Sequence, residues 1–230
     1  MTPSLLCIIF FSLAFSSKPL KAQPYRLNGM RDVSIWALSG THYWINKNWE
    51  NRIPLEGNYW RTVGFDKWAP TELTKPLAWA SDFTANACFT GFGALGFFLP
   101  QDARLGYWQL GAQNVLLTAN ITQSIKMTAR RARPFNQPGY NFDHKDQFYS
   151  FLSGHSSTTA AAATTAWLAM REYPDLRLTA NIIGYSTAAL AVSTATLRVA
   201  AGKHYPSDVI AGIALGVGVS VLNQKIHERF

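Results

Sequence analysis

Three residues that can carry chemistry lie in one short turn: Arg198, His204 and Asp208. A guanidinium binds an oxyanion through two parallel hydrogen bonds, and a carboxylate near an imidazole fixes its tautomer and stabilises its cation. The turn is therefore a candidate site for an anionic ligand. On its own it is equally explained as a capped helix junction with solvated charges.

A second polar stretch begins at Lys126 and ends at Arg133, directly before Pro134. Seven residues make nearly two helical turns, so the two cations would share one face about 10 Å apart along the axis. Pro134 disfavours helix at Arg133 and is predicted to end it there. Alone, a basic helix end also serves as a complement to the helix dipole.

A third polar stretch, Ser153-Gly154-His155, opens an apolar run. Ser153 is a favourable N-cap, and Gly154 lets the backbone approach a ligand closely. Free N–H groups at a helix start point toward an anion, which the helix dipole also favours. His155 alone is also explained as a capping or packing histidine.

Five apolar segments must position these residues, and each is long enough for a helix. They cover 77–99, 106–128, 155–170, 181–199 and 209–222, with connecting turns at 100–105 and 171–177. Ser207 is predicted to cap the last helix. If the helices alternate in direction, three cations, a helix N-terminus and two histidines converge at one end. That combination predicts a phosphate pocket with a nucleophile and a proton donor.

The predicted fold class is all-α: a bundle of five to six mostly apolar helices with the active site at one end. The net charge of +8 suits an anionic ligand or a membrane surface. No run of Lys and Arg exceeds two residues, which argues against nucleic acid as a partner. The only cysteines are Cys7 and Cys88, so neither a disulfide framework nor a thiolate metal site is expected.

The chain resembles the type 2 phosphatidic acid phosphatase and vanadium haloperoxidase superfamily over roughly residues 76–222. The family has three motifs: lysine, six residues and Arg-Pro; Pro-Ser-Gly-His; and Ser-Arg, five residues, His, three residues and Asp. With the same spacing they appear here as Lys126 with Arg133-Pro134, Leu152-Ser153-Gly154-His155, and Leu197-Arg198 with His204 and Asp208. Leu152 replaces the family's proline and Leu197 its serine, which puts affinity in question more than activity.

The resemblance implies a role for each matched residue. His204 would be the nucleophile that forms a phosphohistidine, with Asp208 orienting it. His155 would protonate the leaving oxygen and then deprotonate the attacking water. Charge on the equatorial oxygens would be neutralised by three cations and two backbone N–H groups: those of Lys126, Arg133, Arg198, Ser153 and Gly154. No metal or other cofactor is expected, and vanadate is expected to inhibit as a transition-state mimic.

The first 75 residues carry none of these motifs. Residues 1–22 have the shape of a secretory signal peptide, and 23–75 are rich in aromatics. The patch Ser34–Ile45 is predicted to be a helix of about a dozen residues, too short to cross a bilayer that needs ~20, so it is expected at the membrane surface. Asn51–Thr74 reads as loop, and 76–230 as the phosphatase-like helical domain. The loop around His144 and Asp146 is predicted to be solvated.

These features predict a phosphatase that removes phosphate from an anionic lipid. It would lie in the inner membrane, with the site facing the periplasm or exterior. The segment from Gly202 to Gly212 looks more like the membrane lipid phosphatases than the soluble acid phosphatases. Three alternatives stay open: a soluble secreted or periplasmic acid phosphatase, a vanadium haloperoxidase and a membrane scaffold with a relic pocket. Phosphatidate, a polyprenyl diphosphate, phosphatidylglycerol phosphate and lipid A phosphate are all open as substrates.

Overall fold

The structure is a computed structural model that describes residues 29–54, 57–59, 64–136 and 145–228. The predicted signal peptide, Cys7 and His144 lie outside these residues. Six α-helices make up the bundle: α2 (Gly29–Glu50), α3 (Lys75–Leu95), α4 (Gln101–Ala129), α5 (Gly154–Glu172), α6 (Leu178–Ala200) and α7 (Pro206–Glu228). Three 3₁₀ helices accompany them: η1 (Gly64–Trp68), η2 (Gly96–Phe98) and η3 (Lys145–Phe148).

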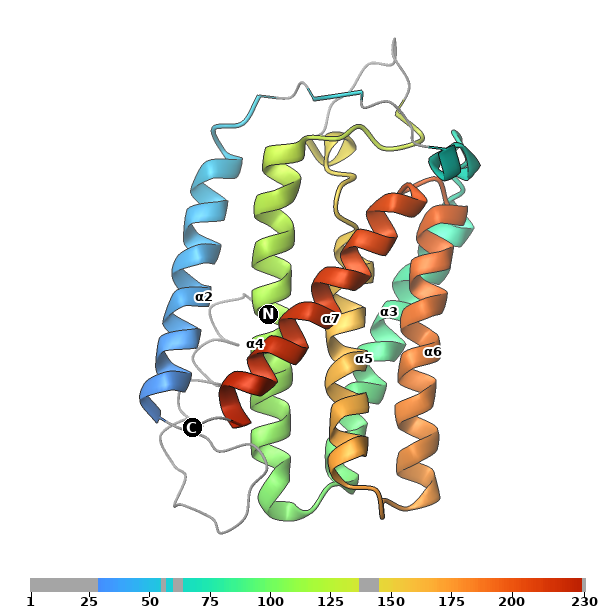
Figure 1. Ribbon diagram of the computed structural model, residues 1–230. Coiled ribbons are helices and arrows are strands. Elements are labelled where there is room, and N and C mark those ends of the chain that lie inside the picture. The colour runs from blue at the N-terminus through green and yellow to red at the C-terminus, as the bar shows by residue number, and fades with distance from the viewer. Residues whose placement is uncertain (1–28, 55–56, 60–63, 137–144, 229–230) are drawn as a thin grey trace.

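The predicted all-α class is confirmed. Within the described ranges the β-structure consists of one isolated bridge between Asn58 and Arg131. The helices lie side by side and alternate in direction, so α4 and α6 end where α5 and α7 begin (Figure 1). All three polar stretches therefore come together at the same end of the bundle.

Helix α5 forms the centre of the bundle and contacts α3, α4, α6 and α7. Its buried residues are almost all alanine, serine and threonine, and such small side chains allow neighbouring backbones to approach closely. At the closest crossing, a Cβ on Gly216 of α7 would overlap the carbonyl oxygen of Ser157. Larger apolar side chains pack at the end of the bundle away from the polar turns, where Leu95, Leu99 and Tyr107 are fully buried.

Helix α2 is longer than predicted. It has 22 residues in place of the expected dozen, and it lies lengthwise beside α4 (Figure 1). Asn120 of α4 donates to the carbonyl oxygen of Ser39 at 2.8 Å and accepts from Asn46 at 2.9 Å. The prediction over Ser34–Ile45 underestimated the length of this helix because the inward face of α2 is polar. A search for regularly spaced apolar residues does not detect such a face.

Two helix starts also differ from the predicted ones. Helix α4 begins at Gln101, so most of the predicted turn 100–105 is helical. Helix α7 begins at Pro206, a residue whose fixed φ suits the first helical position. Ser207 therefore lies inside the first turn and does not cap it. The carboxylate of Asp208 does this instead, accepting from the Tyr205 backbone N–H at 2.9 Å.

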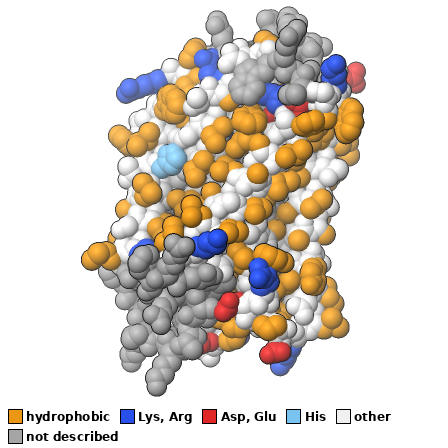
Figure 2. Space-filling view, viewed as in Figure 1, with side chains coloured by type: hydrophobic (Ala, Val, Ile, Leu, Met, Phe, Trp, Pro, Cys, Tyr) orange, Lys and Arg blue, Asp and Glu red, His pale blue; other side chains and the backbone are white. Residues whose placement is uncertain are grey.

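The face of the bundle that Figure 2 shows is apolar around its middle. Hydrophobic and uncharged side chains form a broad band there, and the charged ones lie above and below it. Among the described helices, α6 and α7 are long and apolar enough to cross a membrane. The buried core helix of a soluble protein can meet the same criterion.

Candidate active site

His204 lies in the tight turn between α6 and α7, and its side chain is 1% exposed. The turn depends on Gly202, whose φ of 72° lies in the left-handed region that glycine favours. The ring nitrogen Nδ1 lies 2.8 Å from the carbonyl oxygen of Ser150, an atom that can only accept, so Nδ1 carries the proton. Nε2 lies 3.2 Å from Nη1 of Arg133, which can only donate. His204 is thus fixed as the neutral tautomer with its lone pair on Nε2.

Electrostatics favour the same neutral form. Burial first, and then the positive charges of Arg133, Lys126 and Arg198, hold the pKa of His204 well below its ordinary value. Hydrogen bonding to Ser150 opposes this only in part. A neutral imidazole with an unprotonated nitrogen among cations is able to attack an electrophile that carries negative charge.

Asp208 is fully buried close to His204, but it is not the nearest acceptor to that ring. Its Oδ2 lies 3.7 Å from Nδ1, beyond hydrogen-bond distance, whereas the Ser150 carbonyl lies at 2.8 Å. The Ser150 hydroxyl donates to Asp208 Oδ2. The predicted role of Asp208 is corrected accordingly, because it acts on His204 through Ser150. The carboxylate of Asp208 holds the Ser150 hydroxyl, and the Ser150 carbonyl holds the ring.

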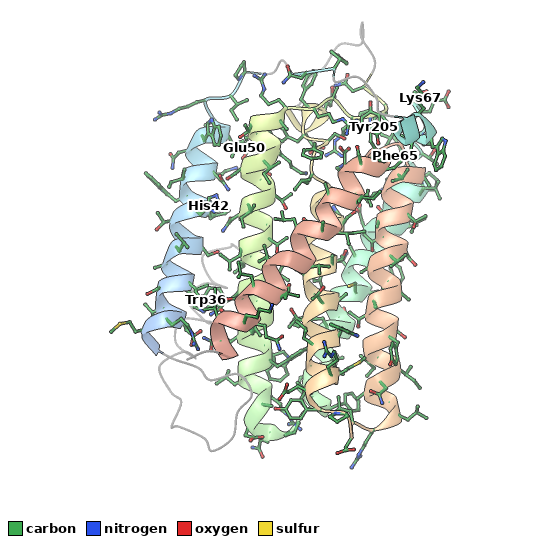
Figure 3. The ribbon with its side chains drawn as sticks, in the orientation of Figure 1. Trp36, His42, Glu50, Phe65, Lys67 and Tyr205 are labelled. Atoms are coloured by element: carbon green, nitrogen blue, oxygen red, sulfur yellow. The ribbon has the colours of Figure 1, made fainter. Side chains whose placement is uncertain are left out.

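Arg131 is a site residue that the sequence analysis missed. Its Nη1 donates to Asp208 Oδ1 at 2.6 Å, and its Nη2 donates to Asp66 Oδ2 at 2.8 Å. Asp66 also accepts from the backbone N–H and the hydroxyl of Ser207. All these charged groups are buried, so η1 is locked onto the first turn of α7. Figure 3 shows Tyr205 beside Phe65 and Lys67 at this end of the bundle.

Arg133 uses almost all of its donors within the protein. Nε donates to the Asp146 carbonyl at 2.7 Å, and Nη2 to the Asp146 carboxylate at 2.7 Å. Nη1 is shared between the Lys203 carbonyl and His204 Nε2. Partial burial alone would raise the pKa of Asp146, but the charges of Arg133 and Lys126 lower it overall. Asp146, predicted to be merely solvated, in fact holds a site cation in place.

Arg198 and His155 share one carboxylate that the sequence analysis did not select. Asp82 Oδ1 lies 3.0 Å from Arg198 Nη1 and 3.1 Å from His155 Nε2. The hydroxyl of Ser81 accepts from the same Arg198 nitrogen at 3.1 Å. Three helices, α3, α5 and α6, thus meet at this carboxylate.

Lys126 and the start of α5 complete the cluster. A Cβ on Gly154 would lie 3.5 Å from Lys126 Nζ, so the ammonium sits over the first turn of α5. Ser153 is the N-cap as predicted, accepting from the Ser156 backbone N–H. Its own N–H, however, donates to the backbone oxygen of Asp208 at 3.1 Å. That donor is already used, which corrects its predicted role in phosphate binding.

A cavity of about 340 Å³ opens beside this cluster, between α3 and α4 and against α5. Its charged end contains Asp82, Lys126 and His155. Phe89 and Ala119 line it seven residues further along α3 and α4, about 10 Å from the charged end. The cavity therefore has one charged end and one largely apolar end.

The four missed residues carried only faint signals. Asp82 is the one acidic residue in the predicted helix 77–99, and Arg131 lies inside the basic run before Pro134. Asp66 and Asp146 lie in segments that the sequence predicts as loops, and nothing in their spacing sets them apart. His42 and His227 belong to none of the three motifs, and they contact Ser124 and Asp32 away from the cluster.

The chain belongs to the PAP2 superfamily, whose family model matches residues 108–229. This confirms the predicted superfamily.

Two curated relatives are phosphatases. A lipid A 1-phosphatase of Rhizobium johnstonii is 33% identical over 121 residues, 50% of this chain and 46% of that protein. An undecaprenyl-diphosphatase of Sulfolobus acidocaldarius is 34% identical over 106 residues, 44% of this chain and 46% of that protein. The chain thus spans about half the length of each of these relatives.

Among solved structures, a transmembrane PAP2 type phosphatidylglycerolphosphate phosphatase from Bacillus subtilis is 19% identical. The alignment covers 99% of this chain and 96% of that one, with a TM-score of 0.48.

Proposed function

We propose that this protein removes phosphate from a phosphorylated lipid through a phosphohistidine formed on His204. The observation that carries the proposal is the state of this ring: Nδ1–H donates to Ser150, and the lone pair of Nε2 faces the guanidinium of Arg133. A phosphate drawn to Arg133 would be brought against the nucleophilic nitrogen. Attack then forms a P–N bond as the bond to the leaving oxygen breaks.

The cations around the ring supply the electrostatic part of the mechanism. Arg133, Lys126 and Arg198 come from three segments, and the charge of each lowers the pKa of His204. Fixed positive charges stabilise the charge that spreads over the equatorial oxygens as phosphoryl transfer proceeds. His155 would give its proton to the leaving oxygen and then take one from the water that hydrolyses the phosphohistidine.

A lipid substrate is supported by the shape of the cavity and by the relatives. An amphiphile would place its phosphate at Lys126 and its first apolar carbons near Phe89 and Ala119. The relatives act, by name, on lipid A and on undecaprenyl diphosphate. The apolar band around the bundle and the two apolar helices α6 and α7 agree with a place in the membrane.

The test is to trap the intermediate. The purified full-length protein in detergent would be incubated with a panel of lipid phosphates, quenched in alkali and digested for mass spectrometry. We expect phosphate release from at least one lipid and a phosphohistidine at His204. His204→Ala should abolish both, whereas His42→Ala should retain activity because His42 contacts Ser124 outside the site. A fully active His204→Ala protein would overturn the proposal.

A water-soluble phosphatase is the main alternative, and the same preparation tests it. A lipid phosphatase should have a far lower KM for lipid phosphates than for short-chain or sugar phosphates. It should also stay with the membrane during a carbonate wash. Equal efficiency on all of them, together with release by carbonate, would favour a soluble acid phosphatase.

A further inference from the structure

The carboxylate of Asp82 contacts both the proposed proton donor His155 and the phosphate-binding cation Arg198, although no sequence motif includes it. Its Oδ1 lies 3.1 Å from His155 Nε2 and 3.0 Å from Arg198 Nη1. Asp82 belongs to α3, which also lines the cavity where the substrate would lie. Its side chain is half exposed, so it faces that cavity.

The contact places a carboxylate against the ring that must carry a positive charge to act as an acid. Asp82 Oδ1 lies 3.1 Å from His155 Nε2, close enough to form an ion pair once the ring is protonated. The side-chain hydroxyls that bond to His155 in the described part of the chain bond to its backbone carbonyl. The ring is therefore left to exchange a proton with the leaving oxygen and then with water.

The charges around His155 give Asp82 a second effect. Burial first, and then the cations Arg198, Lys126 and Arg133, lower the pKa of His155, and Asp82 is the carboxylate that opposes them. The N-terminal end of α5, where His155 lies, also disfavours a positive charge. Without Asp82, the imidazolium needed to donate a proton would form less readily.

We propose that Asp82 is a positioning residue for general acid–base catalysis, holding the ring of His155 in place and stabilising its protonated form. This inference rests on the proposed phosphatase function. In the first step a ring proton of His155 moves to the oxygen whose bond to phosphorus breaks. In the second, a water attacks the phosphorus and gives a proton to His155, while the P–N bond breaks and its electron pair returns to Nε2 of His204. Asp82 stays ionised throughout, so protons and charge balance over the cycle.

A simpler role is that Asp82 only holds Arg198 for phosphate binding. The two roles differ in their dependence on the leaving group. Loss of proton donation slows the release of a poor leaving group, such as a lipid alkoxide, but spares an acidic phenol that needs no proton. A misplaced Arg198 weakens the binding of every phosphate ester alike and so raises KM for all of them.

The chain provides a matched control. The hydroxyl of Ser81 accepts from the same Arg198 nitrogen at 3.1 Å and donates to the Ala78 carbonyl within α3. Ser81→Ala therefore disturbs Arg198 without removing a charge, whereas Asp82→Asn disturbs Arg198 and removes the charge facing His155. Asp82→Asn keeps the size of the side chain and so preserves the packing of α3.

The experiment measures kcat and KM of the full-length protein with a lipid phosphate and with p-nitrophenyl phosphate. For Asp82→Asn we expect kcat on the lipid to fall by about 10- to 100-fold, within the ~10²- to 10⁴-fold worth of general acid catalysis. On p-nitrophenyl phosphate kcat should fall less than about threefold, since that step needs little proton donation. The basic limb of the lipid pH profile should move to lower pH. Ser81→Ala should change KM for both substrates without this selectivity.

Equal losses on both substrates, or a leaving-group selectivity that Ser81→Ala reproduces, would overturn the role of Asp82. If Asp82→Asn fails to fold, Asp82→Glu serves instead, and it should recover most of the lipid rate while the pH profile keeps its basic limb. The wild-type protein separates the two proposals. If it forms no phosphohistidine at His204, the proposed function itself fails, whatever the variants do.

Discussion

The guanidinium of Arg131 donates to Asp208 Oδ1 at 2.6 Å and so ties the end of α4 to the first turn of α7. Its other nitrogen reaches Asp66 of η1 at 2.8 Å. A buried cation between two buried carboxylates compensates their charge, and loss of one partner leaves the others unpaired. This arrangement makes the position of Asp208, and through Ser150 that of His204, depend on a segment that carries no motif.

Replacing Arg131 should therefore destabilise the protein strongly. For Arg131→Leu we expect a loss of about 3–5 kcal/mol in the free energy of unfolding, the usual cost of breaking a buried ion pair. Lys67, which is exposed and follows Asp66 in η1, offers a control. Lys67→Ala should change the free energy of unfolding by less than about 0.5 kcal/mol. Thermal unfolding in detergent measures both. Similar stability of the two variants would show that the buried charges do not hold the turn.

Asp146 should control activity more than stability, because its carboxylate is more than half exposed but holds Arg133 in place. Asp146→Asn removes the charge that faces Arg133 Nη2. We expect kcat to fall by roughly 10-fold, less than the ~10²-fold that a 1 Å misplacement of a catalytic group can cost. Asp102→Asn, at the start of α4 and away from the site, is the control. An unchanged kcat in Asp146→Asn would mean that the backbone contacts of Arg133 suffice.

Stability at acid pH should reflect the lowered pKa of His204. The unfolded ring titrates near pH 6.5, whereas burial and neighbouring cations push the pKa of the folded ring well below that. The unfolded state then binds more protons at acid pH. The contribution of the neutral His204 ring to stability is therefore fully present above about pH 6.5 and is lost as the pH falls. The Tm of the wild type should therefore drop relative to that of His204→Asn between about pH 6.5 and pH 4. Parallel Tm curves would contradict a depressed pKa.

Activity should follow the same titration. An unprotonated Nε2 on His204 is required for attack, so kcat/KM should hold through the weakly acid range and decline only at lower pH. The measurement is a pH profile of kcat/KM with a substrate that does not ionise in that range. A loss of activity centred near pH 6.5 would indicate a ring with an ordinary pKa.

Metal removal should leave activity intact, because the proposed charge stabilisation comes from Lys126, Arg133 and Arg198. We expect full turnover in excess chelator and strong inhibition by orthovanadate, which adopts the pentacoordinate shape of the transition state. Binding of vanadate should be lost in Arg133→Ala, whose guanidinium contacts Nε2 of His204. Activity that disappears with chelator and returns with magnesium or zinc would refute the metal-independent mechanism.

Membrane topology should place the active site on the outer face. Helix α2 begins at the end of the bundle opposite the site, and helix α7 ends there (Figure 1). Reporters inserted before Gly29 and fused after Phe230 should therefore both read as cytoplasmic. A cleaved signal peptide would put the start of α2 outside, so it is incompatible with an outward site if α2 crosses the membrane. An exported reporter at Phe230 would contradict the outward-facing site.

The sequence by itself determined the bundle and supplied most residues of the candidate site. Apolar runs set the helices, because a face of small and apolar residues has to be buried. The spacings of Lys126 to Arg133 and of His204 to Asp208 are local, so their chemistry was readable without coordinates. The same reasoning underestimated α2, whose buried face is polar and is satisfied only by partners on α4.

Tertiary structure alone decided how the charges pair. Asp82 reaches Arg198 across 116 positions of sequence, and Asp66 reaches Arg131 across 65. No periodicity relates residues so far apart, because their distance depends on how whole helices pack. The structure likewise showed that Ser150, through a backbone carbonyl, is the nearest acceptor for His204. A carbonyl oxygen is present at every residue, so only the folded chain determines which one faces the ring.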